Sequence, residues 1–141
     1  MSEREIFITR LDKERLEELL EVAKNIGKPN REDAQNLRDL ERELQRAQVV
    51  APDEVPADVV TMNSKVVLRD VKTSEEMTYT LVFPRNASMA AGAISVLAPI
   101  GTAILGYREG DEVEWRVPSG MRRIAILKLL YQPEAAGDFH L

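Results

Sequence analysis

The chain has 141 residues, a formal net charge of −5 and no cysteine. This length provides one ordinary domain, or a small domain with an appendage, that can bury a core. The lack of cysteine excludes disulfides, thiolate chemistry and Cys-type zinc sites. Acidic and basic residues are mixed along the whole chain, which argues against the basic face that direct nucleic-acid binding needs.

The ends of the chain and its hydropathy favour a soluble cytoplasmic protein with no membrane partner. Residues 1–5 are polar and charged, unlike a secretory signal. The apolar runs are far shorter than the about 20 residues that cross a bilayer. The single histidine, His140, lies one residue from the end, and we expect it to be solvated rather than a ligand.

Residues 1–50 are predicted to form a short antiparallel helical hairpin. The apolar run at residues 6–8 indicates an edge strand or a segment packed under the hairpin. Thr9 is suited to cap the first helix, with Asp12 completing a capping box. Apolar residues then recur at helical spacing over residues 12–26, a length of about 22 Å.

The turn of the hairpin is neutral and basic. A glycine and a proline end the first helix here, and an asparagine begins the second. Because the connection between the two helices is so short, they are expected to pack antiparallel. Two hypotheses remain for the hairpin: it packs on the rest of the protein, or it projects as an arm. The predicted tip consists of Gly27, Lys28, Pro29, Asn30 and Arg31.

Residues 51–141 are predicted to form a mainly antiparallel β domain with one short helix, which makes the fold class α+β. Alternation at residues 77–83 indicates a strand with one face inward. The run at residues 123–131 is apolar at nearly every position, as in a central strand covered on both faces. The other expected elements are a linker at residues 50–56, strands at 65–69, 94–97 and 113–117, and a helix at 99–105.

The segment that begins at Pro99 is the most informative part of this domain. It holds no obvious nucleophile, base or metal ligand, so we expect it to present a surface for docking. We expect Ile104 and Leu105 to point inward, and Pro99 and Ile100 to lie partly outward. Gly101 is expected to be needed for backbone geometry.

This segment resembles the C-terminal, FKBP-like domain of the bacterial Gre transcript-cleavage factors. The resemblance is closer to a shorter relative, the family of regulators of nucleoside diphosphate kinase (Rnk), whose pattern is echoed at residues 56–64 and 131–138. It extends over almost the full chain. The matching residues of the segment are Pro99, Gly101, Ala103, Ile104, Leu105, Gly106, Gly110, Asp111, Val113, Pro118 and Gly120.

The resemblance implies a non-enzymatic transcription regulator with RNA polymerase as its partner. Gre factors place their globular domain on the rim of the polymerase secondary channel, and the matching docking segment here is Pro99, Ile100 and Gly101. The chain is then expected to compete with Gre factors and to regulate nucleoside diphosphate kinase indirectly. The fold implied is a hairpin at residues 1–50 followed by the Gre C-terminal-like domain at residues 51–141.

The alternative is a Gre-type transcript-cleavage factor. Gre factors carry acidic residues at the tip of a long coiled coil, where carboxylates help to hold a catalytic magnesium ion. In this chain the only acids near the tip are Glu32 and Asp33, which suit any helix start. The short hairpin and its basic tip favour docking without catalysis. We therefore expect no catalytic residue, no cofactor and no resident metal, and no prolyl isomerase activity from the FKBP-like fold alone.

Overall fold

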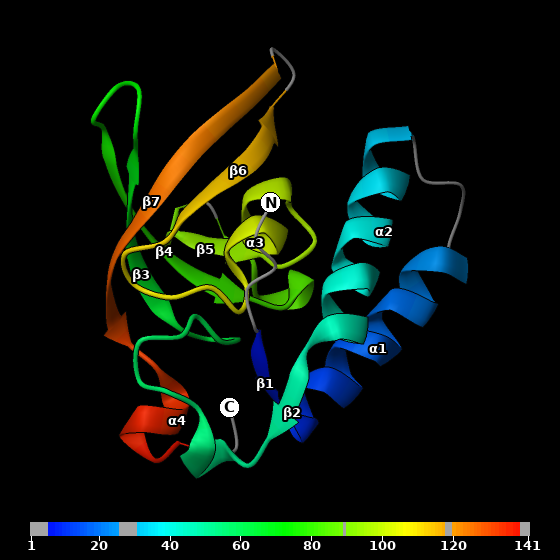
Figure 1. The fold of residues 1–141 in the computed structure, drawn as a ribbon. Helices are drawn as coiled ribbons and strands as arrows, with labels where there is room; N and C mark the ends of the chain where they lie inside the picture. The colour runs from blue at the N-terminus through cyan, green and yellow to red at the C-terminus, as the bar shows by residue number, and fades with distance from the viewer. Residues whose placement is uncertain (1–5, 26–30, 89, 118–119, 139–141) are drawn as a thin grey trace.

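The computed structural model describes residues 6–25, 31–88, 90–117 and 120–138, without the side chains of residues 31–33 and 116–117. It confirms the α+β class: two N-terminal helices lie beside a twisted sheet that carries one short helix, α3 (Figure 1). The elements are β1 (Phe7–Thr9), α1 (Arg10–Asn25), α2 (Arg31–Arg46), β2 (Gln48–Val50), η1 (Pro52–Glu54), β3 (Lys65–Asp70), β4 (Glu76–Val82), η2 (Pro84–Asn86), β5 (Ala93–Ser95), α3 (Pro99–Ile104), β6 (Glu112–Val117), β7 (Gly120–Tyr131) and α4 (Pro133–Ala136).

The base of the hairpin is closed by a pair of short parallel strands. Thr9 caps α1 as predicted, because its Oγ1 accepts a hydrogen bond of 3.1 Å from the amide of Asp12. Directly before this cap, β1 pairs with β2, so that Ile8 lies opposite Val49. A packed strand at residues 6–8 is predicted from the sequence, but its partner β2 is not, because the three residues of β2 are too few to show a periodic pattern.

The two helices run in opposite directions but are staggered (Figure 1). Lys24, near the end of α1, forms an ion pair with Glu41, which lies well inside α2. The first turns of α2 therefore extend past the end of α1. In these turns Asn36 hydrogen-bonds to Thr102 of α3, and α2 contacts both α1 and α3.

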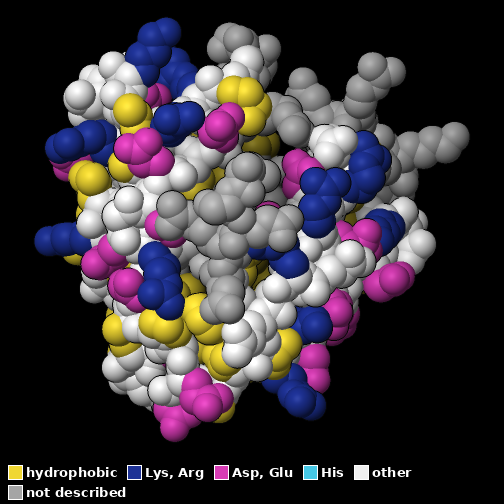
Figure 2. All heavy atoms as spheres, in the orientation of Figure 1, with side chains coloured by type: hydrophobic (Ala, Val, Ile, Leu, Met, Phe, Trp, Pro, Cys, Tyr) yellow, Lys and Arg dark blue, Asp and Glu magenta, His cyan; other side chains and the backbone are white. Residues whose placement is uncertain are grey.

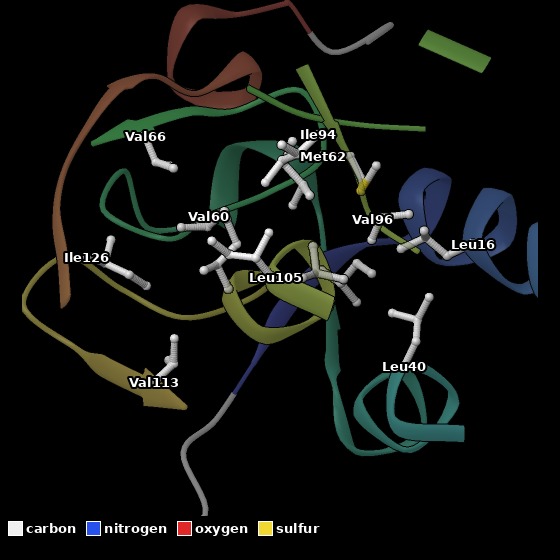
Figure 3. Close-up of a cluster of buried hydrophobic side chains, with 14 of the residues drawn as sticks. Leu16, Leu40, Val60, Met62, Val66, Ile94, Val96, Leu105, Val113 and Ile126 are labelled. Atoms are coloured by element: carbon white, nitrogen blue, oxygen red, sulfur yellow. The ribbon is translucent and has the colours of Figure 1, made fainter. Parts of the chain in front are cut away.

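The hairpin shares its core with the β domain. Leu16 of α1 and Leu40 of α2 are fully buried, and Figure 3 shows both near Val96, in the connection to α3. Leu37 and Leu44 belong to the same cluster. The described part of the hairpin thus packs on the rest of the protein, and the hypothesis of a projecting arm is wrong for it.

The main sheet has the strand order β5-β4-β3-β7-β6. The expected antiparallel pairing is present throughout except at one edge, where β5 runs parallel to β4. Buried side chains of the sheet meet those of α3 and the hairpin, and the fully buried ones include Val66, Leu68, Ile124 and Ile126. This arrangement puts the core on the side of the sheet that faces the helices.

One prediction about the sheet is wrong. Strand β7 is not covered on both faces, since Leu127 and Leu130 are exposed on it. Its apolar run resembles a doubly covered strand, but the described helices pack on one face only. In β4 the predicted inward face is present, because Leu81 is in the core and Met77, Tyr79 and Phe83 pack against it. Val82, on the other face, is buried as well.

Candidate docking surface

The docking segment is the first turn of α3, and the turn before it is fixed by hydrogen bonds. Ser95 Oγ accepts from the amide of Leu97 at 3.0 Å, and the carbonyl of Ser95 accepts from the amide of Ala98 at 3.0 Å. Pro99 then occupies a position in the first turn of the helix, where its missing N–H is not needed. The segment therefore has a set shape before any partner arrives.

Gly101 is required for a close approach between backbones. A Cβ atom at this position would lie 2.2 Å from the carbonyl oxygen of Ser95 and 3.0 Å from the Cα of Val96. No side chain fits there unless the backbone moves. The glycine was expected to serve backbone geometry, and the structure gives the cause: the first turn of α3 rests directly on the end of β5.

The exposed part of the docking segment differs from the expectation at one residue. Pro99 is exposed, while Ile104 and Leu105 point into the core as predicted. Ile100 was expected to lie partly outward, but it is only 8% exposed. Its position one residue after Pro99 turns it toward the core side of α3, so the outward apolar surface consists of Pro99 with the half-buried Leu97 and Ala98 before it.

Asn36 joins α2 to the docking segment. Its Nδ2 donates hydrogen bonds to the carbonyl of Leu97 and, at 3.0 Å, to Thr102 Oγ1. Thr102 in turn donates to the carbonyl of Val96 at 2.7 Å. Asn36 is only 8% exposed, so these bonds replace water that a free amide would bind. No sequence signal marked this residue, because a buried asparagine in an amphipathic helix follows the pattern of a polar surface position.

A cleft of about 540 Å³ lies beside the docking segment, between α2, α3 and β6. Pro99 and Thr102 line it from α3, and Glu43 lines it from α2. Burial raises the pKa of the Tyr107 hydroxyl on its wall, with a further contribution from the negative charge of Glu43. The indole Nε1 of Trp115 is buried at the cleft and has no hydrogen-bond partner among the described residues.

The predicted hairpin tip falls largely outside the described residues. This holds for Gly27, Lys28, Pro29 and Asn30, while Arg31 is the first residue of α2. Glu32 and Asp33 are in the first turn of that helix, and their side chains are likewise outside the description. Within the described residues, no group of three or more His, Cys, Asp or Glu side chains could hold a metal ion.

The two motifs that pointed to the Rnk family, at residues 56–64 and 131–138, lie against each other at the base of the molecule. Gln132 Nε2 donates to the carbonyls of Pro56 at 2.8 Å and Val59 at 2.7 Å. Thr61 Oγ1 donates to Glu134 Oε1 at 2.7 Å. These bonds fasten Gln132 and α4 to the loop before β3, which explains the polar residues that the two motifs contain.

Asp12 reaches the same region from the start of α1. It is 2% exposed and accepts a hydrogen bond from the backbone of Met62. Burial, followed by the negative charge of Glu134, raises the pKa of its carboxyl to about 7. The hydrogen bond from Met62 and the charge of Arg15 act in the opposite direction. The carboxyl is therefore partly protonated near neutral pH, and its hydrogen bond from Met62 connects the hairpin to the motif at residues 56–64.

The described surface mixes charges of both signs. On the face in Figure 2, Lys and Arg side chains alternate with Asp and Glu over both the sheet and the helices. The described residues on this face form no continuous basic stripe of the kind typical of proteins that bind phosphate backbones. Within the residues that the structure describes, no helix is long and apolar enough to cross a membrane.

Two family models match the chain. The model described as Rnk N-terminus matches residues 4–50, and the model described as the C-terminal part of the transcription elongation factors GreA/GreB matches residues 54–131. The boundary between the matches falls at β2 and η1, where the hairpin ends. The two models therefore divide the chain close to the place where the structure passes from helices to sheet.

Individual relatives agree with these matches. The chain is 44% identical over 142 aligned positions to the regulator of nucleoside diphosphate kinase of Escherichia coli K12, with all of both chains covered. It is 39% identical to the transcription elongation factor GreA of Desulfotalea psychrophila, over 73% of this chain and 61% of that protein. A solved transcription elongation factor GreA/GreB from Nitrosomonas europaea superposes with a TM-score of 0.73 at 44% identity, covering 92% of this chain and 100% of that one.

Proposed function

The chain belongs to the Rnk family of Gre-like transcription factors, and from this we propose that it is a non-enzymatic regulator that binds RNA polymerase. We place the contact at the rim of the secondary channel, where it would exclude Gre factors. An effect on nucleoside diphosphate kinase, the enzyme in the name of its relatives, would then be indirect, through transcription. We keep the division into a hairpin at residues 1–50 and a docking domain at residues 51–141 as part of this proposal.

The observation that carries the proposal is the rigid presentation of Pro99. Gly101 seats the first turn of α3 on β5, and Asn36 holds the preceding turn from the hairpin side. An apolar residue held outward on a fixed backbone loses little conformational entropy when a partner covers it. Because Ile100 is buried, we assign the contact to Pro99 and Leu97, with Ile100 and Gly101 as its support.

The position of the hairpin favours docking over transcript cleavage. Each helix has 16 residues, which corresponds to about 24 Å of helix. Among the described side chains of α2, which begin at residue 34, Asn36 is the first that is buried, five residues after the helix starts. Along the helix axis, the backbones of Glu32 and Asp33 therefore lie within about 8 Å of Asn36. A reach this short does not bring carboxylates deep into a channel whose entrance the domain occupies.

Co-sedimentation with core RNA polymerase at low salt tests the contact. We expect the wild type to bind and a Gre factor to displace it. Pro99→Asp should weaken binding about tenfold or more. Aspartate is tolerated in a first helical turn, so the fold should persist. The matched control is Pro52→Asp, which makes the same change in the first turn of another short helix, η1.

Two results would contradict the proposal. Equal binding by Pro99→Asp and Pro52→Asp would remove the docking segment from the interface, and no binding by the wild type would remove the polymerase as partner. A stalled-complex assay tests the non-enzymatic part separately. Short 3′ RNA fragments that disappear with Glu32→Gln and Asp33→Asn would show that the chain is a cleavage factor.

A further inference from the structure

Strand β6 has a free edge that faces the cleft. Among the described residues it is the last strand of the sheet and β7 is the one strand that pairs with it, while α3 packs against it. The amide of Ile126 in β7 donates to the carbonyl of Asp111 at 2.8 Å, just before β6 begins. In an antiparallel pair, residues alternate between those bonded to the neighbour and those that face away. This alternation directs the main-chain groups of Glu112 and Glu114 toward the open edge.

The cleft runs along this edge. Four consecutive residues of β6, from Glu112 to Trp115, line it. Because successive side chains of a strand point to opposite faces, the cleft reaches both faces of β6 at its edge. Met121 and Arg123 of β7 line it too, so it also extends over the face that carries Glu112 and Glu114. Four residues of strand correspond to about 13 Å. Among the described residues, no main-chain hydrogen bond outside the β6–β7 pair satisfies Glu112 or Glu114.

The two faces of this edge differ in character. Glu112 and Glu114 are more than half exposed on one face, and each lies only 3.7–3.8 Å from the similarly exposed Arg123. Ion pairs this open are weak and readily exchanged. On the other face lie the buried Val113 and the half-buried Trp115, whose Nε1 has no partner. Over the whole cleft, four acids face two bases, the four being Asp39, Glu43, Glu112 and Glu114 and the two Arg42 and Arg123.

We propose that the edge of β6 accepts an extended segment of a partner protein as an added strand, in which basic residues alternate with apolar ones. Main-chain hydrogen bonds to Glu112 and Glu114 would give affinity, as in other cases of strand addition. Basic side chains on one face would pair with these two glutamates, while apolar ones on the other would cover Trp115. This contact does not rest on the polymerase proposal, because its recognition elements are in β6 rather than at Pro99.

Other occupants fit the edge less well. A helix satisfies its own main chain, so it would leave the amides and carbonyls of β6 without partners. A second copy of the chain would bring Glu112 and Glu114 toward the same acidic edge, and like charges placed opposite each other destabilise a strand pair. A basic strand avoids both problems.

The single tryptophan, Trp115, provides the measurement. We expect an eight-residue peptide of alternating Lys and Val to shift its fluorescence as the peptide is titrated into the full chain. The same peptide methylated at all its amide nitrogens should bind about tenfold more weakly or worse, because it cannot donate main-chain hydrogen bonds. A Glu–Val peptide should not bind.

Variants of the protein locate the site. Glu112→Lys with Glu114→Lys should weaken Lys–Val binding about tenfold, and the milder Glu112→Gln with Glu114→Gln should act in the same direction if the reversed pair folds poorly. The matched control is Glu17→Lys with Glu18→Lys, an identical charge change on the exposed face of α1. The proposal would be overturned if the Lys–Val peptide does not bind, or if its methylated form binds equally well. It would also be overturned if a peptide of the same composition, with Lys and Val at helical spacing, binds more tightly, or if the control variant weakens binding as much as the β6 variants do.

Discussion

Two glycines around α3 are needed for different reasons. Gly106 adopts φ +84°, and a Cβ there would meet Ile6 Cγ2 at 2.0 Å, so both backbone conformation and space exclude a side chain. Gly101 lies within the helix α3, and it is the backbone of Ser95 and Val96 that excludes a side chain there. At Gly101, helix propensity and packing therefore predict effects of opposite sign.

The substitution Gly101→Ala separates these two effects. Helix propensity alone predicts a gain of about 1 kcal/mol, whereas a contact of 2.2 Å with backbone predicts a loss, which we expect to be about 1–3 kcal/mol. Urea denaturation measures the difference. A higher midpoint for the variant would show that α3 does not rest on β5 as described. Gly110→Ala is a useful comparison, because a Cβ there meets nothing within 4 Å and only its φ of +90° opposes it.

Asp12 should make stability depend on pH. Burial raises its pKa from 3.8 to about 7 in the folded protein, so between these values the folded state holds a proton that the unfolded state has lost. The stabilisation from this proton is complete below about pH 4 and is lost as the pH rises to about 7. In denaturant titrations, Asp12→Asn should reduce this fall in the free energy of unfolding.

The control for Asp12 is Glu17→Gln, a change from acid to amide on the exposed face of the same helix. It should leave the pH dependence of the wild type in place. If Asp12→Asn keeps the full pH dependence as well, the carboxyl of Asp12 is ionised throughout this range in the folded protein.

At the scale of elements, the contact between α2 and α3 determines where the hairpin lies. The stagger of the helices carries the first turns of α2 past the end of α1, and α2 contacts both α1 and α3. Asn36 supplies the polar part of this contact through Leu97 and Thr102, and the neighbouring Leu37 is buried in the shared core. The same contact supports the docking segment, so the hairpin contributes to the docking surface without projecting from it.

Asn36→Ala tests this contact. It leaves the carbonyl of Leu97 without its donor, and we expect a loss of about 1–3 kcal/mol in the free energy of unfolding. Arg38→Ala, an exposed position on the same helix, should change that free energy by no more than about 0.5 kcal/mol. Chemical denaturation followed by circular dichroism gives both values. Similar values for the two variants would show that Asn36 does not hold the hairpin in place.

At the scale of the whole molecule, one core extends from the hairpin to the sheet. Leu16 and Leu40 belong to the same buried cluster as Val66 of β3 and Ile126 of β7. The two family models nevertheless divide the chain between residues 50 and 54. A shared core predicts that both parts unfold together, although each has its own sequence signature.

Leu40→Ala should destabilise both parts at once. Loss of this fully buried side chain should cost about 2–5 kcal/mol. Helical circular dichroism reports mainly on the hairpin, and Trp115 fluorescence reports on the sheet. We expect the two signals to move to the same lower midpoint in urea. A shift of the helical signal alone would show that the hairpin unfolds separately from the sheet.

Local chemistry was sufficient for much of the fold. Thr9 caps α1 because a hydroxyl directly before a helix can accept a hydrogen bond from one of its unpaired first amides. The helix α3 begins at Pro99 because proline is tolerated in the first turn of a helix but not in its interior. The strands with clear alternation, such as β6, were placed for the same reason. These features depend on residues that are neighbours in the sequence, so the sequence determines them by itself.

Only the tertiary structure decided how distant segments meet. The pairing of β1 with β2, the burial of Ile100 and the bonds from Asn36 to Leu97 involve residues that no local pattern relates. Whether an apolar strand such as β7 is covered on one face or two depends on how many layers pack on the sheet. The hydrophobic pattern of the strand's own sequence does not contain this information. The hairpin was identified from its sequence, but its place against the docking segment follows from a core built by both halves of the chain.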